Sequence, residues 1–161
     1  MTIFATAGAK LFIGSEIDVT DELDEASFAG QSTEWVEIRQ LEALGSLGDT
    51  AEAITFTSIE RARVQKLKGS RDAGTMEIVA GIDYADAGQQ ALLAAEQSDA
   101  NYAFKMVFDD APAGGTPSER KFGAIVGSAA EAYDTANNVM KLSASLWVNS
   151  NTVRTAAAAA G

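Results

Sequence analysis

The feature that most constrains this fold is a strict alternation of apolar and polar side chains along short segments. In residues 102–108, YAFKMVF, large apolar side chains occupy every second position. Successive side chains of a β-strand point to opposite faces, so this pattern indicates a strand that buries one face. A chain with several such segments has to pack them as sheets, apolar face against apolar face.

Further strands are predicted where the alternation recurs or where β-branched residues cluster. They are residues 10–14, 35–41, 53–59, 75–82, 119–128 and 138–149. Turn-forming residues separate them, and the loop 109–118 holds both prolines. Residues 129–137 are predicted to form the polar connection between the last two strands.

One segment, residues 86–97, has the pattern of a helix. Asp86 at the N-cap and Gln89 three residues later resemble a capping box. Ala87, Leu92 and Ala95 follow helical spacing, so one face can pack on a sheet. We therefore expect a mainly β fold: a small antiparallel β-sandwich or partly open barrel with one flanking α-helix, in a single domain over residues 1–161.

The two ends of the chain are predicted to lie outside this sandwich. Residues 1–34 form an N-terminal arm with an acidic loop, in which residues 15–25 carry six acids and no basic residue. Calcium loops need alternating oxygen ligands and a central glycine, whereas Ile17, Val19 and Leu23 interrupt the acids here. We expect a solvated loop rather than a cation site. Residues 150–161 contain a run of five alanines before Gly161, too few for an isolated helix, and are predicted to be a flexible tail.

Basic residues are concentrated in residues 60–71. Arg61, Arg63, Lys66, Lys68 and Arg71 all lie there. The opposite charge of the acidic run 15–25 makes the two segments candidates for pairing, either within one chain or between subunits. Under the alternative interpretation, the basic residues cover a solvated surface hairpin.

The chain contains no histidine and no cysteine. That excludes Ser-His-Asp and Cys-His nucleophiles, His/Cys zinc sites and disulfides. Residues 69–75 have P-loop glycine spacing, but Thr75 stands where lysine is required. Asp109 and Asp110 are adjacent, and neighbouring side chains on a strand point apart, which does not suit paired acid–base chemistry. We expect neither enzymatic activity nor a cofactor.

Charge and hydropathy bear on the partners and the location of the protein. Twenty-three acidic residues against 12 basic ones give a formal net charge of −11, which argues against gripping nucleic-acid phosphates. No segment reaches the roughly 18 apolar residues of a membrane span. The first basic residue, Lys10, lies inside the apolar N-terminal stretch, so that stretch is a poor signal peptide and we expect synthesis in the cytoplasm.

The order of these features resembles a known family. A glycine-punctuated basic stretch leads to a strand, the helix, the aromatic strand 102–108, RKFGAIVGS, a turn with Asn137 and Asn138, and a last strand VMKLSASLWVNS. GQQALLA, residues 88–94, is similar to the start of that family's helix. From residue 38 to 151 the chain resembles the major tail tube protein of long, non-contractile-tailed, lambda-like phages and of related gene transfer agents.

The resemblance implies a structural role. Hexameric rings would share one sheet per subunit in a continuous barrel and stack into a hollow tube that conducts DNA from capsid to host. Its partners would be further copies of itself, the tape measure protein, the tail terminator and distal tail or baseplate proteins. DNA would pass without specific binding, and no membrane is involved. The protein would reside in the virion tail after assembly in the host cytoplasm.

The resemblance also implies candidate residues. Residues 43–71 would be the loop that reaches the next ring, and the termini would bridge subunits. Inter-subunit contacts would involve Arg61, Arg63, Lys66 and Lys68 with Glu16, Asp18, Asp21 and Glu22. Acids that flank or lie within strands are candidates for the channel wall, with solvated exterior charge as the alternative for each: Glu77, Asp109, Glu119, Glu131 and Asp134.

Two other functions remain open at this point. The first is a tube or ring protein of a contractile tail or secretion system, which would share the lineage. The second is a small ligand-binding β-barrel, which would need a convergent polar pocket.

Overall fold

The computed structural model describes residues 3–31 and 34–160, which form mainly β-structure with one α-helix. In chain order the elements are β1 (Lys10–Glu16), η1 (Glu25–Gln31, a 3-10 helix), β2 (Val36–Ile38), β3 (Leu41–Ala43), β4 (Thr50–Thr57), β5 (Val64–Asp72), β6 (Thr75–Gly81), α1 (Ala87–Glu96), β7 (Tyr102–Val107), β8 (Glu119–Ala132), β9 (Lys141–Val148) and β10 (Val153–Thr155). The predicted fold class is confirmed.

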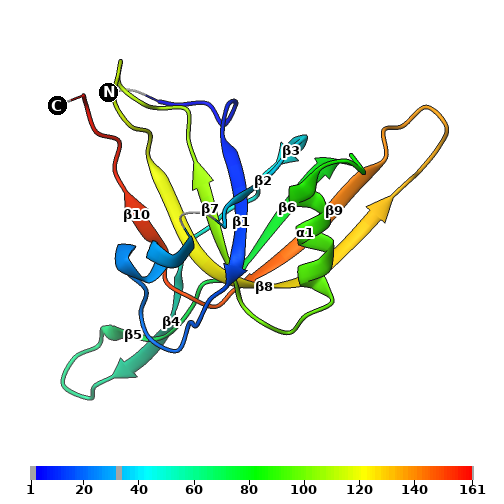
Figure 1. Ribbon diagram of the computed structural model, residues 1–161. Coiled ribbons are helices and arrows are strands. Elements are labelled where there is room, and N and C mark those ends of the chain that lie inside the picture. Colours follow the sequence, from blue (N-terminus) through cyan, green and yellow to red (C-terminus); the bar gives the residue numbers. More distant parts are fainter. Residues whose placement is uncertain (1–2, 32–33, 161) are drawn as a thin grey trace.

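One antiparallel sheet runs in the order β2-β1-β7-β8-β9-β6-β3, with β10 beside β8, and β4 pairs only with β5. The long strand β8 serves two partners: its first part pairs with β7 and its second part with β9. Figure 1 shows β8 sweeping from one wing of the molecule to the other. The sheet therefore bends at β8 into two diverging wings. One wing holds β2, β1, β7, β10 and the first part of β8, and the other holds the second part of β8 with β9, β6 and β3. The described strands do not close into a barrel.

The hydrophobic core lies between the wings. The rings of Phe104 on β7 and Phe122 on β8 stack with their centroids 5.6 Å apart, and both residues are fully buried. Ile78 on β6 and Leu146 on β9 pack against them from the other wing, and Leu92 of α1 joins the same cluster. These are the inward positions of the alternating segments, so the alternation correctly predicted which residues form the core.

Helix α1 begins as predicted, with Asp86 accepting a hydrogen bond from the backbone N–H of Gln89 at 3.1 Å. The Gln89 side chain, however, does not complete a capping box. Its amide oxygen accepts from the backbone N–H of Asp83, and its nitrogen donates to the carbonyls of Arg39 (3.1 Å) and Gly81 (2.8 Å). Gln89 therefore ties the start of α1 to the ends of β2 and β6.

The prediction of one strand over residues 35–41 is wrong. Gln40 has a positive φ of 60°, and the chain turns there. β2 pairs with β1 on one wing, whereas β3 pairs with β6 on the other. A segment that crosses between wings has to break, and nothing in the local pattern marks glutamine as the residue that does so.

The boundaries near the end of the chain also differ from expectation. β8 continues to Ala132, so the connection before the last strand starts later than predicted, and β9 starts at Lys141 rather than residue 138. The predicted flexible tail is wrong for residues 153–155, which form β10 and pair with residues 119–121 of β8. Further on, Thr116 and Ala158 exchange two backbone hydrogen bonds of 2.8 and 3.1 Å. Residue 161 lies outside the described residues.

Residues 17–31, which we call the strap, fold over the outer face of β7 and β8. Their apolar side chains form a second cluster with Ala103, which includes Leu23 and Phe28 with Ile17 and Val19 beside them. A side chain at Gly123 would collide with Val19, so the glycine permits the close approach. The predicted acidic loop is thus anchored by the residues that separate its acids. Residues 1–2 and 32–33 of the predicted arm lie outside the described residues.

Across residues 3–31 and 34–160, no helix is long and apolar enough to cross a membrane.

Candidate assembly surfaces

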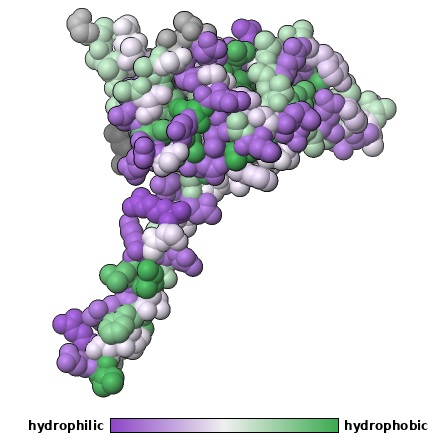
Figure 2. All heavy atoms as spheres, turned by 60° about the horizontal axis from the view of Figure 1, so that its bottom comes forward, coloured by the Kyte–Doolittle hydropathy of each residue, from purple (hydrophilic) through white to green (hydrophobic). Residues whose placement is uncertain are grey.

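The β4–β5 hairpin projects from the body of the molecule (Figure 1). Its register places Ile54 opposite Leu67 and Phe56 opposite Gln65, so three large apolar side chains share one face. All three are exposed, Phe56 to 60%, and Figure 2 shows hydrophobic atoms along this projection. An isolated two-stranded hairpin is marginally stable in water, and an exposed apolar face usually marks a contact surface.

The opposite face of the hairpin is basic. Lys66 and Lys68 alternate with the apolar positions, and Arg61 and Arg63 lie in the turn at the tip. Within the described residues, none of these four cations forms an ion pair; only Arg71, at the root, contacts Asp49 at 3.8 Å. The pairing of the four with the acidic run inside one chain is therefore not found, and their pairing between subunits stays a prediction.

The acids of the run 15–25 other than Glu25 are exposed to solvent. Asp18 accepts a hydrogen bond from the backbone N–H of Thr20 at 2.9 Å, and the Thr20 hydroxyl lowers the pKa of Asp18. Asp21 and Glu22 line a cleft of about 370 Å³ at the root of the hairpin. No group of three or more acids close enough for a metal ion occurs in residues 3–31 and 34–160. Negative charge therefore gathers beside the root of the hairpin.

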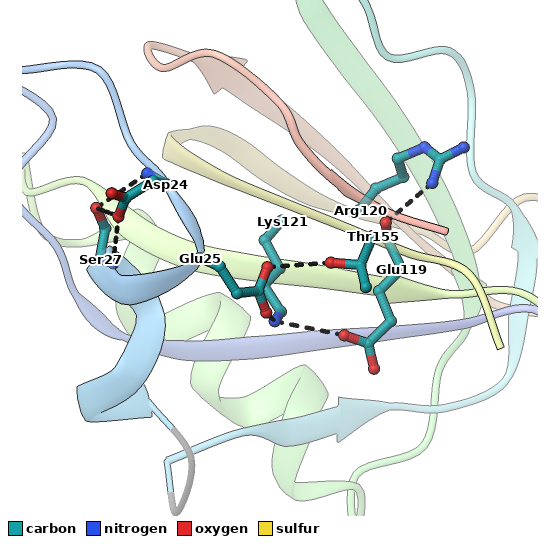
Figure 3. Close-up of polar contacts among 7 residues, drawn as sticks. All are labelled: Asp24, Glu25, Ser27, Glu119, Arg120, Lys121 and Thr155. Carbon is teal, nitrogen blue, oxygen red and sulfur yellow. Dashed lines mark hydrogen bonds and ion pairs between the residues drawn. The ribbon is translucent and has the colours of Figure 1, made fainter. Parts of the chain in front are cut away.

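A buried lysine fastens the strap to the sheet (Figure 3). The Lys121 side chain, only 11% exposed, pairs with Glu25 of η1 and contacts Glu119 at 3.4 Å. The Thr155 hydroxyl on β10 donates to Glu25 at 3.0 Å, and the hydrogen bond from Lys121 lowers the pKa of Glu25. This cluster, the Glu25 clip, joins η1, β8 and β10. Sequence reasoning missed it because its members are far apart along the chain.

The outer face of the other wing carries small polar side chains. Glu77 on β6, Ser145 on β9 and Ser128 on β8 lie in one cross-strand row. The Ser145 hydroxyl lies 2.7 and 2.9 Å from the two carboxylate oxygens of Glu77. Ser143 and the half-exposed Trp147 belong to the same face. We call it the serine face.

Only Glu77 of the five predicted channel acids lies on the serine face. Glu119 belongs to the Glu25 clip, on the strap side of the other wing. Asp109 follows β7 and lies against Gly8. Glu131 is opposite Leu142 and borders a small cleft beside α1, and Asp134 lies in the β8–β9 turn with a φ of 51°. The structure thus does not bring these acids together in one subunit.

The wing that bears the serine face has two open edges. Residues 125–132 of β8 pair with β9 alone, since the ladder with β7 ends at Ala124. At the other edge β3 is the last of the described strands and is bonded to β6. Unpaired backbone N–H and C=O groups at such edges are available to a strand of another chain.

Comparison with known proteins gives a likeness in structure only. No protein-family model matches the chain, and no curated protein matches it in sequence. A chain in the cryo-EM structure of the anti-feeding prophage baseplate matches with a TM-score of 0.68 at 12% identity, covering 97% of this chain and 98% of that chain. A chain of the SPP1 tail tube matches with a TM-score of 0.61 at 16% identity, covering 92% and 76%.

A third match comes from the virion of a native gene transfer agent particle. Its chain aligns with a TM-score of 0.60 at 17% identity, covering 76% of this chain and 89% of that chain. The fold implied by the sequence resemblance is thereby confirmed: the chain has the fold found in tail tube proteins.

Proposed function

We propose that this protein is a structural subunit of a phage-type tail tube, in which hexameric rings stack into a hollow tube that conducts DNA. The observation that carries the proposal is the match to a chain of the SPP1 tail tube over 92% of the present chain. The exposed apolar face of the hairpin and the open edges of the sheet agree with it, because a further copy can cover the one and pair with the other. The role needs no catalytic residue and no cofactor.

Ring closure is proposed to use the two open edges of the serine-face wing. If β8 of one copy pairs with β3 of the next, the sheets continue from subunit to subunit. A ring of such sheets closes into a barrel and leaves no edge exposed. The serine face would then line the channel, with Glu77 as its acid in each subunit.

Stacking is proposed to use the projecting hairpin. Its apolar face would be buried against the next ring, and Lys66 and Lys68 would meet acids of the strap, including Asp21 and Glu22. A head-to-tail contact that does not close on itself generates a filament. The chain's net charge of −11 would keep DNA phosphates from adhering during passage.

The remaining partners follow from the same role. A tube of defined length needs a tape measure protein inside it, a terminator at one end and distal tail or baseplate proteins at the other. The protein would be part of the virion tail and would assemble in the host cytoplasm.

Electron microscopy of the concentrated, purified protein tests the proposal. Negative staining is expected to show hollow tubes built of stacked rings, with six-fold symmetry in end views. Monodisperse monomers that persist at high concentration, or that copurify with a small molecule, would contradict it and favour a ligand-binding β-barrel.

A contractile injection system is the second candidate. It is favoured by the match to a chain of the anti-feeding prophage baseplate, which covers 97% of this chain. A contractile sheath gene beside the gene for this protein, or copurification of a sheath protein with its tubes, would select this candidate. A neighbourhood with terminase, portal and tape measure genes and no sheath would select the first.

A further inference from the structure

Two arginines face each other across the pair formed by β8 and β10. Arg120 and Arg154 are directly opposite in the antiparallel register. Like charges in that position repel and destabilise a sheet. Neither guanidinium forms an ion pair within residues 3–31 and 34–160, although the chain is strongly acidic. An anion supplied by another molecule would relieve the repulsion between the two guanidinium groups.

The two arginines line a cleft of about 220 Å³ between the wings, together with both polar and apolar residues. Met76, Met106 and Phe108 line it, and the Arg120 guanidinium carbon lies 5.5 Å from the centroid of the Phe108 ring. Figure 3 shows the Arg120 side chain leaving β8 on the side opposite to Lys121, away from the Glu25 clip. We call this site the arginine cleft. Its chemistry suits a carboxylate that directly follows an aliphatic side chain.

The tip of the projecting hairpin has that chemistry. Ile59 is fully exposed there, and Glu60 comes next. Figure 1 places the hairpin at one end of the molecule and the chain termini at the other, and Thr6 near the N-terminus lines the arginine cleft. The tip points away from the body that contains the cleft, so the two cannot meet within one copy, but they can meet between two copies arranged head to tail.

Among the large exposed hydrophobic residues of the described chain, one other is followed by an acid, Tyr133 before Asp134. The Tyr133 hydroxyl donates a hydrogen bond to Glu131 at the end of β8. The hairpin tip has the longer reach, because it stands at the end of two paired strands that project from the body. It is therefore the better occupant of a recessed cleft.

We propose that the arginine cleft binds the hairpin tip of a second copy, with Ile59 on the apolar floor and the Glu60 carboxylate between Arg120 and Arg154. The contact rests on the proposed tube function and assigns a partner residue to each side of the stacking interface. Ile59 and Glu60 at the tip would thus bind the arginine cleft, whereas Lys66 and Lys68 on the basic face would meet acids of the strap.

A charge exchange tests the contact. Glu60→Arg is expected to lower the pelletable tube fraction at least tenfold, because it brings a third cation to the cleft. Adding Arg154→Glu in the same chain is expected to restore tubes. Glu52→Arg, the same change at the root of the hairpin, serves as the matched control and is expected to assemble like the wild type. Circular dichroism before assembly checks that each variant is folded.

Cysteine pairs give a second readout against a background without cysteine. Ile59→Cys combined with Thr152→Cys, which lines the cleft, is expected to give a ladder of disulfide-linked oligomers on mild oxidation of tubes. Ile59→Cys with Ser128→Cys on the serine face is expected to give none. If the wild type forms tubes, two outcomes would overturn the contact alone. Either Glu60→Arg assembles normally, or Glu52→Arg lowers the pelletable tube fraction as much as Glu60→Arg does. Failure of the wild type to form tubes would overturn the proposed function as well.

Discussion

The indole ring of Trp147 on β9 occupies the space where Gly127 on β8 has no side chain. The register between β8 and β9 shifts at this point, between Val126 and Ser128. A β-bulge bends the strand that carries it. Here the Trp147 ring lies over the glycine and covers backbone that has no side chain of its own. The bulge lies in the part of β8 that pairs with β9, and so it bends β8 within the wing that bears the serine face.

Substitution of Gly127 is expected to destabilise the subunit. In Gly127→Ala the new methyl group would collide with the Trp147 ring, and such overpacking costs roughly 1–3 kcal/mol. Urea denaturation of the unassembled protein measures the loss. Gly48→Ala is the control, because nothing lies within 4 Å of a Cβ at that position. Equal stability of Gly127→Ala and wild type would mean that the ring does not constrain the bend.

The sequence predicts those elements in which the spacing of apolar residues indicates the buried face. β7 and β9 alternate because one face of each meets the core, and α1 has both its cap and its apolar stripe. Two features have no residue pattern from which they could be predicted. β10 is three residues long, too short for a period, and Gln40 turns the chain with a positive φ although glutamine has no preference for it.

The candidate surfaces were predicted only in part, for a related reason. The charge pattern predicts the basic residues of the hairpin, whereas the β-branched composition of residues 53–59 predicts a strand without indicating that one of its faces stays exposed. Likewise Ile17, Val19 and Leu23 interrupt the acids of a possible cation loop in the sequence, whereas in the structure they anchor the strap. Apolar residues at alternate positions within a charged segment were the available signal in both cases.

The Glu25 clip should make stability depend on pH in the acidic range. Lys121 holds the pKa of Glu25 below its ordinary value, so the unfolded state takes up the proton first as the pH falls. The clip's contribution is therefore fully present above the ordinary carboxyl pKa and is lost as the pH falls through the lowered one. Glu25 is largely exposed, so the contribution is about 1 kcal/mol or less.

We expect Glu25→Gln to lower the free energy of unfolding at pH 7, by an amount that shrinks as the pH is lowered toward 3 and Glu25 becomes protonated. Chemical denaturation across that range, with Glu22→Gln as the control from the same acidic run, measures the difference. A gap between Glu25→Gln and wild type that stays constant down to pH 3 would rule out an ionised clip.

Removal of β10 should weaken the isolated subunit. Deleting residues 153–161 removes the ladder with residues 119–121 of β8, the Thr155 contact to Glu25 and the bridge from Ala158 to Thr116. The expected loss is roughly 1–3 kcal/mol in the free energy of unfolding. Deleting only residues 159–161 serves as the control and should have little effect. Unchanged stability of the longer deletion would restore the interpretation of this segment as a flexible tail.

The position of the serine face in the tube can be tested by labelling. In Ser145→Cys the chain carries a single thiol on that face. After tube assembly we expect this thiol to react with a small maleimide but not with one attached to a protein too wide for the channel. Glu52→Cys on the hairpin serves as a second labelled position, and both should react with both reagents before assembly. Reaction of Ser145→Cys with the wide reagent in intact tubes would place the serine face on the outside.

The basic face of the hairpin gives the last prediction. Lys66 and Lys68 are exposed and have no ion-pair partner among the described residues, so reversing both charges should leave the fold of the subunit intact. If these lysines meet strap acids of the next ring, Lys66→Glu with Lys68→Glu should abolish stacking by repulsion. Raised ionic strength should weaken wild-type tubes by screening the same attraction. Sedimentation at low and high salt measures both effects, with Lys66→Arg and Lys68→Arg together as the charge-conserving control. Tubes that form normally from the reversed protein would show that these lysines merely cover a solvated surface.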